Sequence, residues 1–314
     1  MWPKHLITVA DLSVGDIEDI FRQTAELKSS LGGGDSGGCS EAGAEKPLAG
    51  KTLALVFEKS SLRTRVSFDV AMRQLGGGTI YLSRQDIDLG HRESVRDVAK
   101  TLSRYVDVIA LRTFRHETVL EMAKDSTVPV INALSDYTHP CQALTDLYTV
   151  REKRGTLERV KVSFIGDGNN VARSLAMLCA KLGVGFCIAS PRGYGLDNEF
   201  LDKISASVTH SPLSATTDPS EAVAGADVVY TDTWISMGQE AEAEKKRRDF
   251  RGYCVDAALV AGAKKDVLVM HCLPAHRGEE ISGDVLDGPN SIVYDQAENR
   301  LHVQKAILKI LLTG

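Results

Sequence analysis

Short apolar runs alternate with amphipathic stretches along this chain. Each run has four to seven residues and is rich in β-branched side chains, a length that suits a buried strand better than a helix. The runs occupy residues 52–57, 106–111, 128–134, 160–165, 185–190, 226–231 and 267–270. Between two of them, Val171, Leu175, Leu178 and Leu182 follow at helical spacing and predict one apolar helix face. The alternation predicts an α/β fold with mostly parallel sheets.

Length, charge and cysteine content narrow the class of protein. The 314 residues favour two domains, each large enough for its own core. The net charge is -5 and basic residues form no stripe, so nucleic acid is not an expected partner. Six cysteines without a Cys-x-x-Cys pair argue against a disulfide scaffold or a zinc ribbon and favour a cytoplasmic location. No secretory signal pattern and no run of roughly twenty apolar residues is present, so we expect a soluble protein with no membrane partner.

The segment EKSSLRTRVSF, residues 58–68, places cationic and hydroxyl side chains between the first apolar run and a predicted helix. Parallel sheets bind ligands beyond the carboxyl ends of their strands, and a helix N-terminus favours an anion. Ser61, Arg63, Thr64 and Arg65 add donors whose geometry matches phosphate. The alternative is a capped helix with solvated arginines.

Two further loops carry polar side chains after apolar runs. Arg112 directly follows the run at 106–111. His139 and Gln142 lie in HPCQ, where Pro140 suits the first turn of a helix. A neutral histidine there could donate a hydrogen bond to a carbonyl oxygen, although a structural role is the alternative.

The stretch MHCLPAHRGEEI, residues 270–281, suggests two familiar sites that we do not favour. A zinc site of His271, Cys272 and His276 has a spacing that matches no common ligand pattern. A Cys-His nucleophile lacks an acidic residue in a recognisable signature.

The stretch FIGDGNNVARS, residues 164–174, partly matches a dinucleotide-binding turn. It has two of the three fingerprint glycines, and no acidic residue ends the next apolar run, so we do not expect NAD. Asn169 and Asn170 at the helix start suit a small polar ligand such as an amino-acid head group. Residues 32–46 are rich in glycine and poor in apolar side chains, which predicts a surface loop.

Together these motifs resemble those of the aspartate/ornithine transcarbamylase superfamily, and specifically its ornithine branch. SSLRTR resembles the Ser-Thr-Arg-Thr-Arg motif that binds carbamoyl phosphate, and HPCQ resembles the carbonyl-polarising motif. HCLP and DTWISMG, residues 232–238, resemble the pair that marks the ornithine branch, whereas the aspartate branch typically has His-Pro-Leu-Pro. The motifs follow in order along essentially the whole chain.

The resemblance implies a set of residues for carbamoyl phosphate. Side chains and one backbone group would hold the phosphate, namely Ser61, Arg63, Thr64, the backbone of Leu62, and Arg300 closing over it. Arg112 and His139, assisted by Thr64, would bind the carbonyl oxygen. Gln142 and the backbone carbonyls of Cys272 and Leu273 would orient the carbamoyl amide.

It also implies a set for ornithine. The amino-acid end would contact Asn170, Asp232, Ser236 and Met237, with the Cys272 side chain near the δ-amine. A neutral δ-amine attacks the carbonyl carbon of carbamoyl phosphate, phosphate leaves, and citrulline forms. Donors at the carbonyl oxygen and the positioning of both substrates supply the acceleration, so neither a metal nor another cofactor is expected.

The implied architecture is two domains, each a mostly parallel sheet flanked by helices, with a C-terminal helix returning to the first domain. We expect a carbamoyl-phosphate-binding domain over 1–138, completed by a helix over 296–314, and an ornithine-binding domain over 139–295. The implied assembly is a homotrimer with active sites shared between subunits.

Two positions depart from the family pattern. Leu62 replaces a threonine, which removes a hydroxyl but keeps the backbone N–H. Asp88 stands where a neutral residue from a neighbouring subunit commonly faces the phosphate, so we expect it to turn away and pair with Arg92 or His91, or another residue to take that role. These departures leave open a catalytically silent trimeric subunit. A transcarbamylase for another amine, such as putrescine or a derivatised ornithine, is the second alternative.

Overall fold

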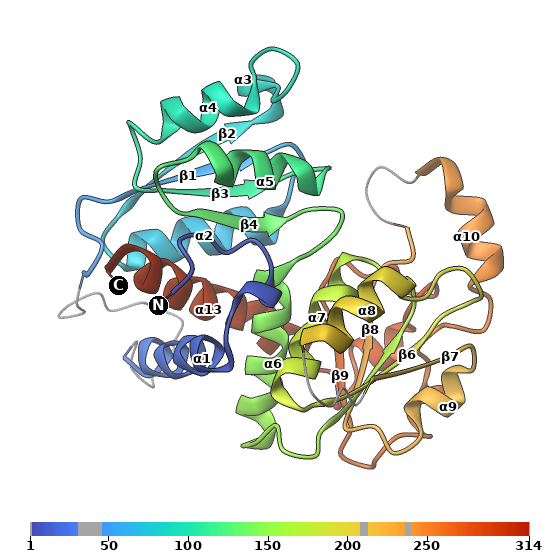
Figure 1. The fold of residues 1–314 in the computed structure, drawn as a ribbon. Helices are drawn as coiled ribbons and strands as arrows, with labels where there is room; N and C mark the ends of the chain where they lie inside the picture. Colours follow the sequence, from blue (N-terminus) through green and yellow to red (C-terminus); the bar gives the residue numbers. More distant parts are fainter. Residues whose placement is uncertain (1, 31–45, 208–212, 236–239, 314) are drawn as a thin grey trace. The chain divides into compact units, whose positions relative to one another are not determined.

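The computed structural model describes residues 2–30, 46–207, 213–235 and 240–313. They form two compact units, which Figure 1 shows as two separate sheets with their helices. Unit 1 comprises Met1–Leu144 and Glu298–Gly314, and unit 2 comprises Thr145–Ala297. The chain passes between them inside α6 (Pro140–Arg154) and α13 (Val293–Thr313), so the C-terminal helix returns to the first unit as predicted.

Unit 1 contains a four-stranded parallel sheet in the order β2-β1-β3-β4. Its strands are β1 (Thr52–Phe57), β2 (Gly78–Ser83), β3 (Val108–Arg112) and β4 (Val130–Leu134). The predicted runs at 52–57, 106–111 and 128–134 are confirmed as β1, β3 and β4. The sequence analysis missed β2 because it is an edge strand whose side chains are only partly buried, so it lacks a continuous apolar run.

The helices of unit 1 cover both faces of this sheet (Figure 1). They are η1 (Val9–Asp11), α1 (Val14–Ser29), α2 (Leu62–Gln74), α3 (Arg84–Ile87), α4 (Val95–Leu102) and α5 (His116–Asp125), besides parts of α6 and α13. Val98 of α4 and Val119 of α5 belong to one buried cluster with Val56 and Ile109 of the sheet. Successive strand residues point to opposite faces, so the equally buried Leu55 lies on the other face.

Unit 2 contains a five-stranded parallel sheet in the order β7-β6-β5-β8-β9. Its strands are β5 (Lys161–Ile165), β6 (Gly185–Ala189), β7 (Leu213–Thr216), β8 (Val228–Thr231) and β9 (Leu268–His271). The strand order reverses between β5 and β8. In open parallel sheets this switch point is where ligands bind, beyond the carboxyl ends of the strands. The fold therefore directs attention to the loops that follow β5, β8 and β9.

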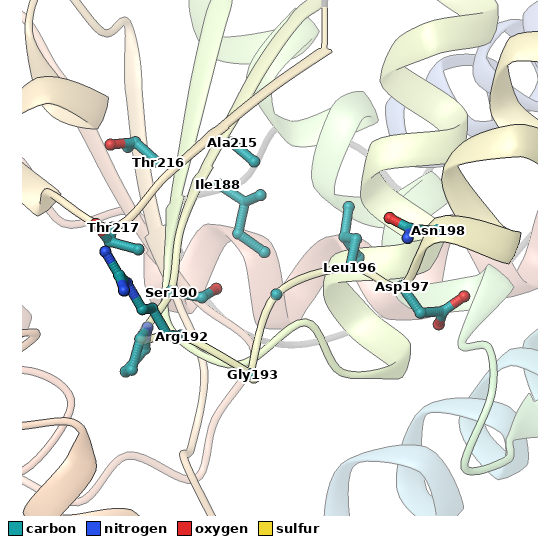
Figure 2. Close-up of a pocket in the computed structure, with 12 residues that line it drawn as sticks. Ile188, Ser190, Arg192, Gly193, Leu196, Asp197, Asn198, Ala215, Thr216 and Thr217 are labelled. Carbon is teal, nitrogen blue, oxygen red and sulfur yellow. The ribbon is translucent and has the colours of Figure 1, made fainter.

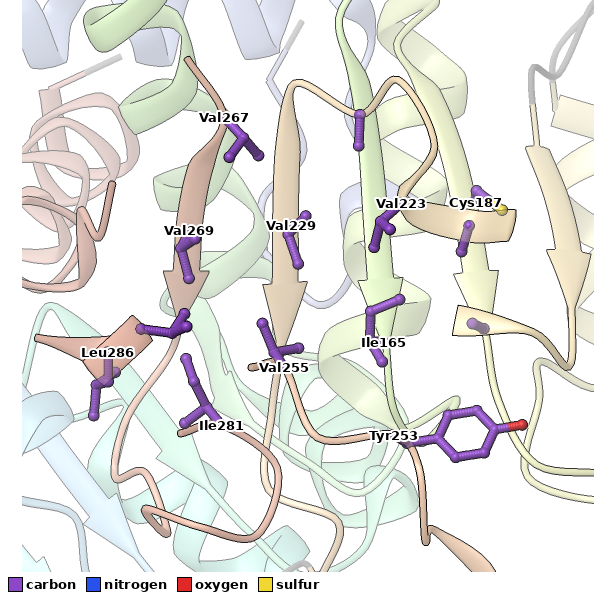
Figure 3. Close-up of a cluster of buried hydrophobic side chains, with 14 of the residues drawn as sticks. Ile165, Cys187, Val223, Val229, Tyr253, Val255, Val267, Val269, Ile281 and Leu286 are labelled. Atoms are coloured by element: carbon purple, nitrogen blue, oxygen red, sulfur yellow. The ribbon is translucent and has the colours of Figure 1, made fainter. Parts of the chain in front are cut away.

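Apolar side chains of neighbouring strands form the core of unit 2. Figure 3 shows Val229 and Val269 side by side on β8 and β9, with Ile165 of β5, Val255 and Ile281 packed nearer the carboxyl ends of the strands. The helices of this unit are α7 (Asn170–Leu182), α8 (Asn198–Ser207), α9 (Pro219–Val223), η2 (Glu240–Glu242), α10 (Ala243–Asp249), α11 (Ala257–Val260) and α12 (Gly283–Leu286).

Helix α7 confirms the predicted helix but is buried more widely than predicted. Val171, Leu175 and Leu178 of the predicted face are buried, and so are Ala172 and Met177 outside it. A helix in this position packs on more than one side, which a single-face pattern does not report.

No described helix has both the length and the apolar character needed to cross a bilayer. The predicted surface loop at 32–46 lies outside the described residues except for Lys46.

Candidate functional site

The first set of predicted residues begins at the start of α2. Ser61 is the N-cap residue, and its Oγ accepts a hydrogen bond from the Thr64 N–H (3.3 Å). Leu62, Arg63 and Thr64 therefore form the first helical turn, where backbone N–H groups lack partners within the helix. The Leu62 side chain is 74% exposed, so its contribution at this turn is its backbone. The cap that the alternative interpretation predicted is therefore present. A capped helix N-terminus can also bind an anion, so the cap does not decide between the two interpretations.

Arg300 of α13 joins two of the other predicted residues. Its guanidinium donates to Gln142 Oε1 (2.8 Å) and to Thr64 Oγ1 (3.1 Å), and all three side chains are buried. The partners are 158 and 236 residues away in sequence. The structure therefore brings together the start of α2, the first turn of α6 and the C-terminal helix.

Arg112 and His139 belong to the same part of unit 1. Arg112 ends β3 and His139 immediately precedes α6, and both side chains are buried. Burial lowers the pKa of His139 well below its ordinary value, and the charges of Arg300 and Arg112 lower it further. His139 is therefore a neutral imidazole between two cations at neutral pH. Such a group can donate one hydrogen bond to an oxygen without adding charge.

Together these six residues form the cationic set, defined as Ser61, Arg63, Thr64, Arg112, His139 and Arg300. Charged and neutral donors in a buried environment stabilise an anion or a developing oxyanion more strongly than they would in water. Burial raises the pKa of neighbouring Cys141 to about 12, so that thiol stays protonated and is not a candidate nucleophile.

Asp88 pairs with a different residue from those predicted. It caps α3 in the left-handed conformation (φ 47°), and its carboxylate pairs with Arg84 (3.4 Å). Arg92 instead donates to the backbone carbonyl of Asp86 (3.2 Å). The expected pairing with Arg92 or His91 is therefore wrong. Arg84 lies four positions before Asp88, and this spacing within one helical turn decides the pairing.

The second set lies in unit 2, around one buried carboxylate. Asp232 directly follows β8, and its Oδ1 accepts hydrogen bonds from the Cys272 thiol (2.9 Å) and the Thr233 N–H (2.8 Å). Its Oδ2 accepts from Asn169 Nδ2 (2.8 Å). The loops after β5, β8 and β9 thus meet at this carboxylate, as the switch point requires. We call Asn169, Asn170, Asp232 and Cys272 the carboxylate set.

The two adjacent asparagines have different roles. Asn169 caps α7, because its Oδ1 accepts from the N–H groups of Val171 and Ala172, and its amide nitrogen holds Asp232. Asn170 is the first residue of the helix and is half-buried. The sequence analysis assigned both to ligand binding and missed the part that Asn169 plays in orienting Asp232.

Gly168 of the same loop serves close packing. A Cβ at this position would lie 2.5 Å from the Gly195 carbonyl carbon, and the Gly168 N–H donates to the Tyr194 carbonyl (2.7 Å). A side chain at residue 168 would thus clash with the neighbouring loop, which explains why the dinucleotide-like pattern has a glycine there.

His271 and Glu280 hold the loop that follows β9. Both side chains are fully buried; His271 Nδ1 accepts from the Leu273 N–H (2.8 Å), so Nε2 carries the proton that faces Glu280 (3.1 Å). Burial by itself raises the pKa of Glu280, but hydrogen bonds from His271 and from the His276 N–H leave it below its ordinary value. Glu280 is the acidic partner that the sequence analysis did not find. Because His271 is engaged on both nitrogens and the Cys272 thiol points to Asp232, this arrangement does not form a Cys-His nucleophile.

Among the described residues, a separate pocket of about 560 Å³ lies beyond the ends of β6 and β7, and Figure 2 shows its lining. It contains none of the predicted site residues. The Ser190 and Thr216 hydroxyls already donate to Gly166 and Glu221, and Asp197 pairs with Arg173. Because none of the predicted site residues lines this pocket, we do not take it as the candidate site.

Two predicted residues, Ser236 and Met237, lie outside the described part of the chain. Leu273 is described, and its backbone is in the left-handed region (φ 58°).

The chain belongs to the aspartate/ornithine carbamoyltransferase family. Residues 4–152 match the family's carbamoyl-phosphate-binding domain, and residues 158–311 match its Asp/Orn binding domain. Among curated relatives, the ornithine carbamoyltransferase of Bacillus subtilis is 51% identical over 314 residues, which cover 99% of this chain and 95% of that protein. The anabolic ornithine carbamoyltransferase of Pyrococcus furiosus is 53% identical over 269 residues, 85% of each chain. A solved structure of ornithine carbamoyltransferase from Pyrococcus furiosus matches with a TM-score of 0.93 at 47% identity, covering 99% of this chain and 97% of that one.

Proposed function

We propose that this protein is an enzyme that transfers the carbamoyl group of carbamoyl phosphate to the δ-amine of L-ornithine, giving L-citrulline and phosphate. One observation carries the choice of amine. The buried carboxylate of Asp232 lies at the switch point of unit 2, held by Asn169 and by the Cys272 thiol. A buried carboxylate at a ligand site suits the α-ammonium of an amino acid. The curated relative from Pyrococcus furiosus that is named anabolic supports a biosynthetic direction.

In this proposal the cationic set binds carbamoyl phosphate. The α2 turn of Ser61, Leu62, Arg63 and Thr64 holds the phosphate, and Arg300 adds a second guanidinium. Arg112 and His139 donate to the carbonyl oxygen. The neutral state of His139 supports this role, because the hydrogen bond strengthens as negative charge develops on that oxygen. Gln142, which Arg300 orients, and the carbonyls of Cys272 and Leu273 bind the carbamoyl amide.

The carboxylate set, with Ser236 and Met237, binds ornithine. Asp232 meets the α-ammonium, and Asn170 and Ser236 meet the α-carboxylate. Cys272 lies beside the δ-amine. The neutral amine forms a bond to the carbonyl carbon, the bond from that carbon to the phosphate oxygen breaks, and one proton leaves the nitrogen. No metal or other cofactor takes part in these steps.

We propose a homotrimer that shares active sites between subunits. Apolar side chains on α2 and β2 support an interface near the phosphate turn: Leu62, Val66 and Ile80 are 74%, 49% and 46% exposed. The two elements are in contact through Arg65, which stacks on Tyr81 (3.8 Å). Exposed apolar side chains on two elements that are in contact support a subunit interface there.

Subunit sharing is testable by complementation. Mixing an Arg112 variant with a variant altered in residues 84–94 should restore partial activity, because some hybrid sites receive intact parts from both. Absence of complementation, or a monomer by light scattering, would contradict shared sites.

We also propose a cytoplasmic location. The five cysteines within the described residues are all free, as expected in a reducing compartment.

The proposed reaction is tested by incubating the purified protein with carbamoyl phosphate and L-ornithine. We expect citrulline and phosphate in equal amounts. A protein that binds both substrates without forming citrulline would be the silent subunit, and one that carbamoylates putrescine or an Nα-acylated ornithine in preference would be a transcarbamylase for another amine.

A further inference from the structure

Lys246 differs from its neighbours on α10. It is one of four consecutive basic residues, Lys245 to Arg248, and the other three are exposed. Lys246 is only 3% exposed. Burying an ammonium group is costly unless it is paired, so a buried lysine in a surface helix calls for an account of its partners.

The partners of Lys246 belong to the two loops that carry the carboxylate set. Its Nζ donates to Asp167 Oδ2 (2.6 Å) and to the Trp234 carbonyl (3.0 Å). Asp167 follows β5 and precedes Asn169, and Trp234 lies two residues after Asp232. One ammonium group therefore joins the loop that supplies the asparagines to the loop that supplies the carboxylate.

Aromatic packing fixes α10 in this position. Trp234 stacks on Phe250, at the end of α10, with ring centroids 5.3 Å apart. Phe250 also meets the Tyr194 ring edge-on at 4.9 Å, and the Tyr194 hydroxyl donates to Asp249 (2.7 Å). The C-terminal end of the helix, just after Lys246, is thus attached to Trp234 and Tyr194, so the ammonium group has a defined place.

The charge of Asp167 gives Lys246 a second effect. Burial raises the pKa of Asp167, Lys246 opposes that rise, and the nearby charge of Asp232 adds to it. Without Lys246, the carboxylates of Asp167 and Asp232 would stand close together, and the weaker effect of Arg173 would be left to offset the charge of Asp167. Asp167 would then compete with Asp232 for a cationic ligand or share a proton with it.

We propose that Lys246 is a positioning residue for the amino-acid end of the substrate. It holds the loops of Asn169 and Asp232 together and neutralises Asp167, so that Asp232 is the carboxylate that meets the α-ammonium. This inference rests on the proposed function, because it assumes that the carboxylate set binds ornithine.

The test compares Lys246→Met with Lys245→Met, its exposed neighbour on the same helix. Misplacement of binding groups has large kinetic effects, so Lys246→Met should raise the KM for ornithine by about tenfold or more. The KM for carbamoyl phosphate should stay within about twofold, since the side chains proposed to bind its phosphate and carbonyl oxygen lie in unit 1. Lys245→Met should match the wild type in both. An unchanged KM for ornithine in Lys246→Met overturns the proposal.

Two further variants separate positioning from a general loss of structure. Lys246→Met/Asp167→Asn removes both charges and should recover ornithine affinity to within about threefold of wild type, because no buried carboxylate is left unpaired. Lys246→Arg keeps the charge and should recover ornithine affinity in part. The proposed role is overturned if the double variant binds ornithine no better than Lys246→Met does. It is also overturned if Lys246→Met fails to fold and the double variant folds but does not bind ornithine with wild-type affinity.

Calorimetric titration of ornithine distinguishes failure of this inference from failure of the proposed function. Wild-type protein that binds ornithine but forms no citrulline refutes the reaction, and the ratio of Kd values between wild type and Lys246→Met still decides the role of Lys246. Wild-type protein that does not bind ornithine at all refutes both.

Discussion

The two units place polar groups of opposite charge on the same kind of scaffold. In unit 1, Arg112 and Arg300 flank the neutral His139, and Arg300 reaches Thr64 across 236 residues of sequence. In unit 2, three loops converge on the single carboxylate of Asp232. Both sets follow the carboxyl ends of parallel strands, so topology decides where a ligand binds and the loop side chains decide which ligand.

The opposite charges of the two sets match the charges of the two proposed substrates. A cationic set suits the phosphate and the carbonyl oxygen of carbamoyl phosphate, and a carboxylate suits the ammonium of an amino acid. If this division is correct, a change in one unit should alter the kinetic constant of one substrate and leave the other nearly unchanged.

The largest effect should come from Arg63 in the first turn of α2. Arg63→Lys keeps the charge but loses the planar fork that binds two phosphate oxygens, so kcat/KM for carbamoyl phosphate should fall by about a hundredfold or more. The KM for ornithine should change little. Arg73→Lys, at an exposed position in the last turn of the same helix, is the matched control. Wild-type kinetics in Arg63→Lys would remove Arg63 from the cationic set.

A change at Asp232 is the corresponding test for unit 2. Asp232→Asn keeps the shape but removes the charge, so the KM for ornithine should rise by roughly tenfold to a hundredfold. The KM for carbamoyl phosphate should stay near the wild-type value. Asp202→Asn, on the exposed side of α8, should have no effect. A silent Asp232→Asn would show that the carboxylate does not read the amine substrate.

Arg300 should have a smaller effect, because it shares the phosphate with the α2 turn. Arg300→Gln loses the hydrogen bonds to Thr64 and Gln142, so the KM for carbamoyl phosphate should rise by about tenfold and the Tm should fall by several degrees. Steady-state kinetics and thermal unfolding measure the two effects. A lower Tm with unchanged kinetics would make Arg300 purely structural.

The smallest effect is a pH dependence that belongs to unit 1. The pKa of His139 is lowered in the folded state, so below the ordinary value of about 6.5 the unfolded chain binds a proton that the folded protein does not. The contribution of the neutral His139 to the free energy of unfolding should therefore be fully present above that pH. It should fall as the pH drops below it, by at most about 1.4 kcal/mol per pH unit for one proton. Urea unfolding at pH 7.5 and 5.5 should show that the free energy of unfolding falls less in His139→Gln than in the wild type. Equal losses in the two proteins would contradict the lowered pKa.

The sequence predicted the strands that are buried on both faces and the loops that follow them. Continuous apolar runs identified β1, β3 and β4, whereas the edge strand β2 escaped because its burial is partial. The motif loops predicted Arg112, His139, Asp232 and Cys272 as neighbours of their strands' ends. What the pattern could not supply was pairing between distant side chains.

Three pairings illustrate that limit. Asn169 appeared as a ligand-binding residue, and only the structure shows its amide holding Asp232. Glu280 became a partner of His271 through folding of the loop between them. Lys246 stands in a run of four basic residues, and the burial of a single member of that run depends on tertiary packing that no local pattern contains.

The most direct test of the central claim is a competition among amines. Carbamoyl phosphate is supplied with equal concentrations of L-ornithine, putrescine and L-aspartate, and the carbamoylated products are quantified by mass spectrometry. Putrescine leaves the groups that bind the α-carboxylate unmatched, and aspartate replaces the δ-amine arm with a second carboxylate. Unmatched buried polar groups discriminate strongly, so citrulline should exceed either other product by at least roughly a hundredfold. A preference for putrescine or aspartate would contradict the assignment of unit 2 to ornithine, even if carbamoyl transfer itself were observed.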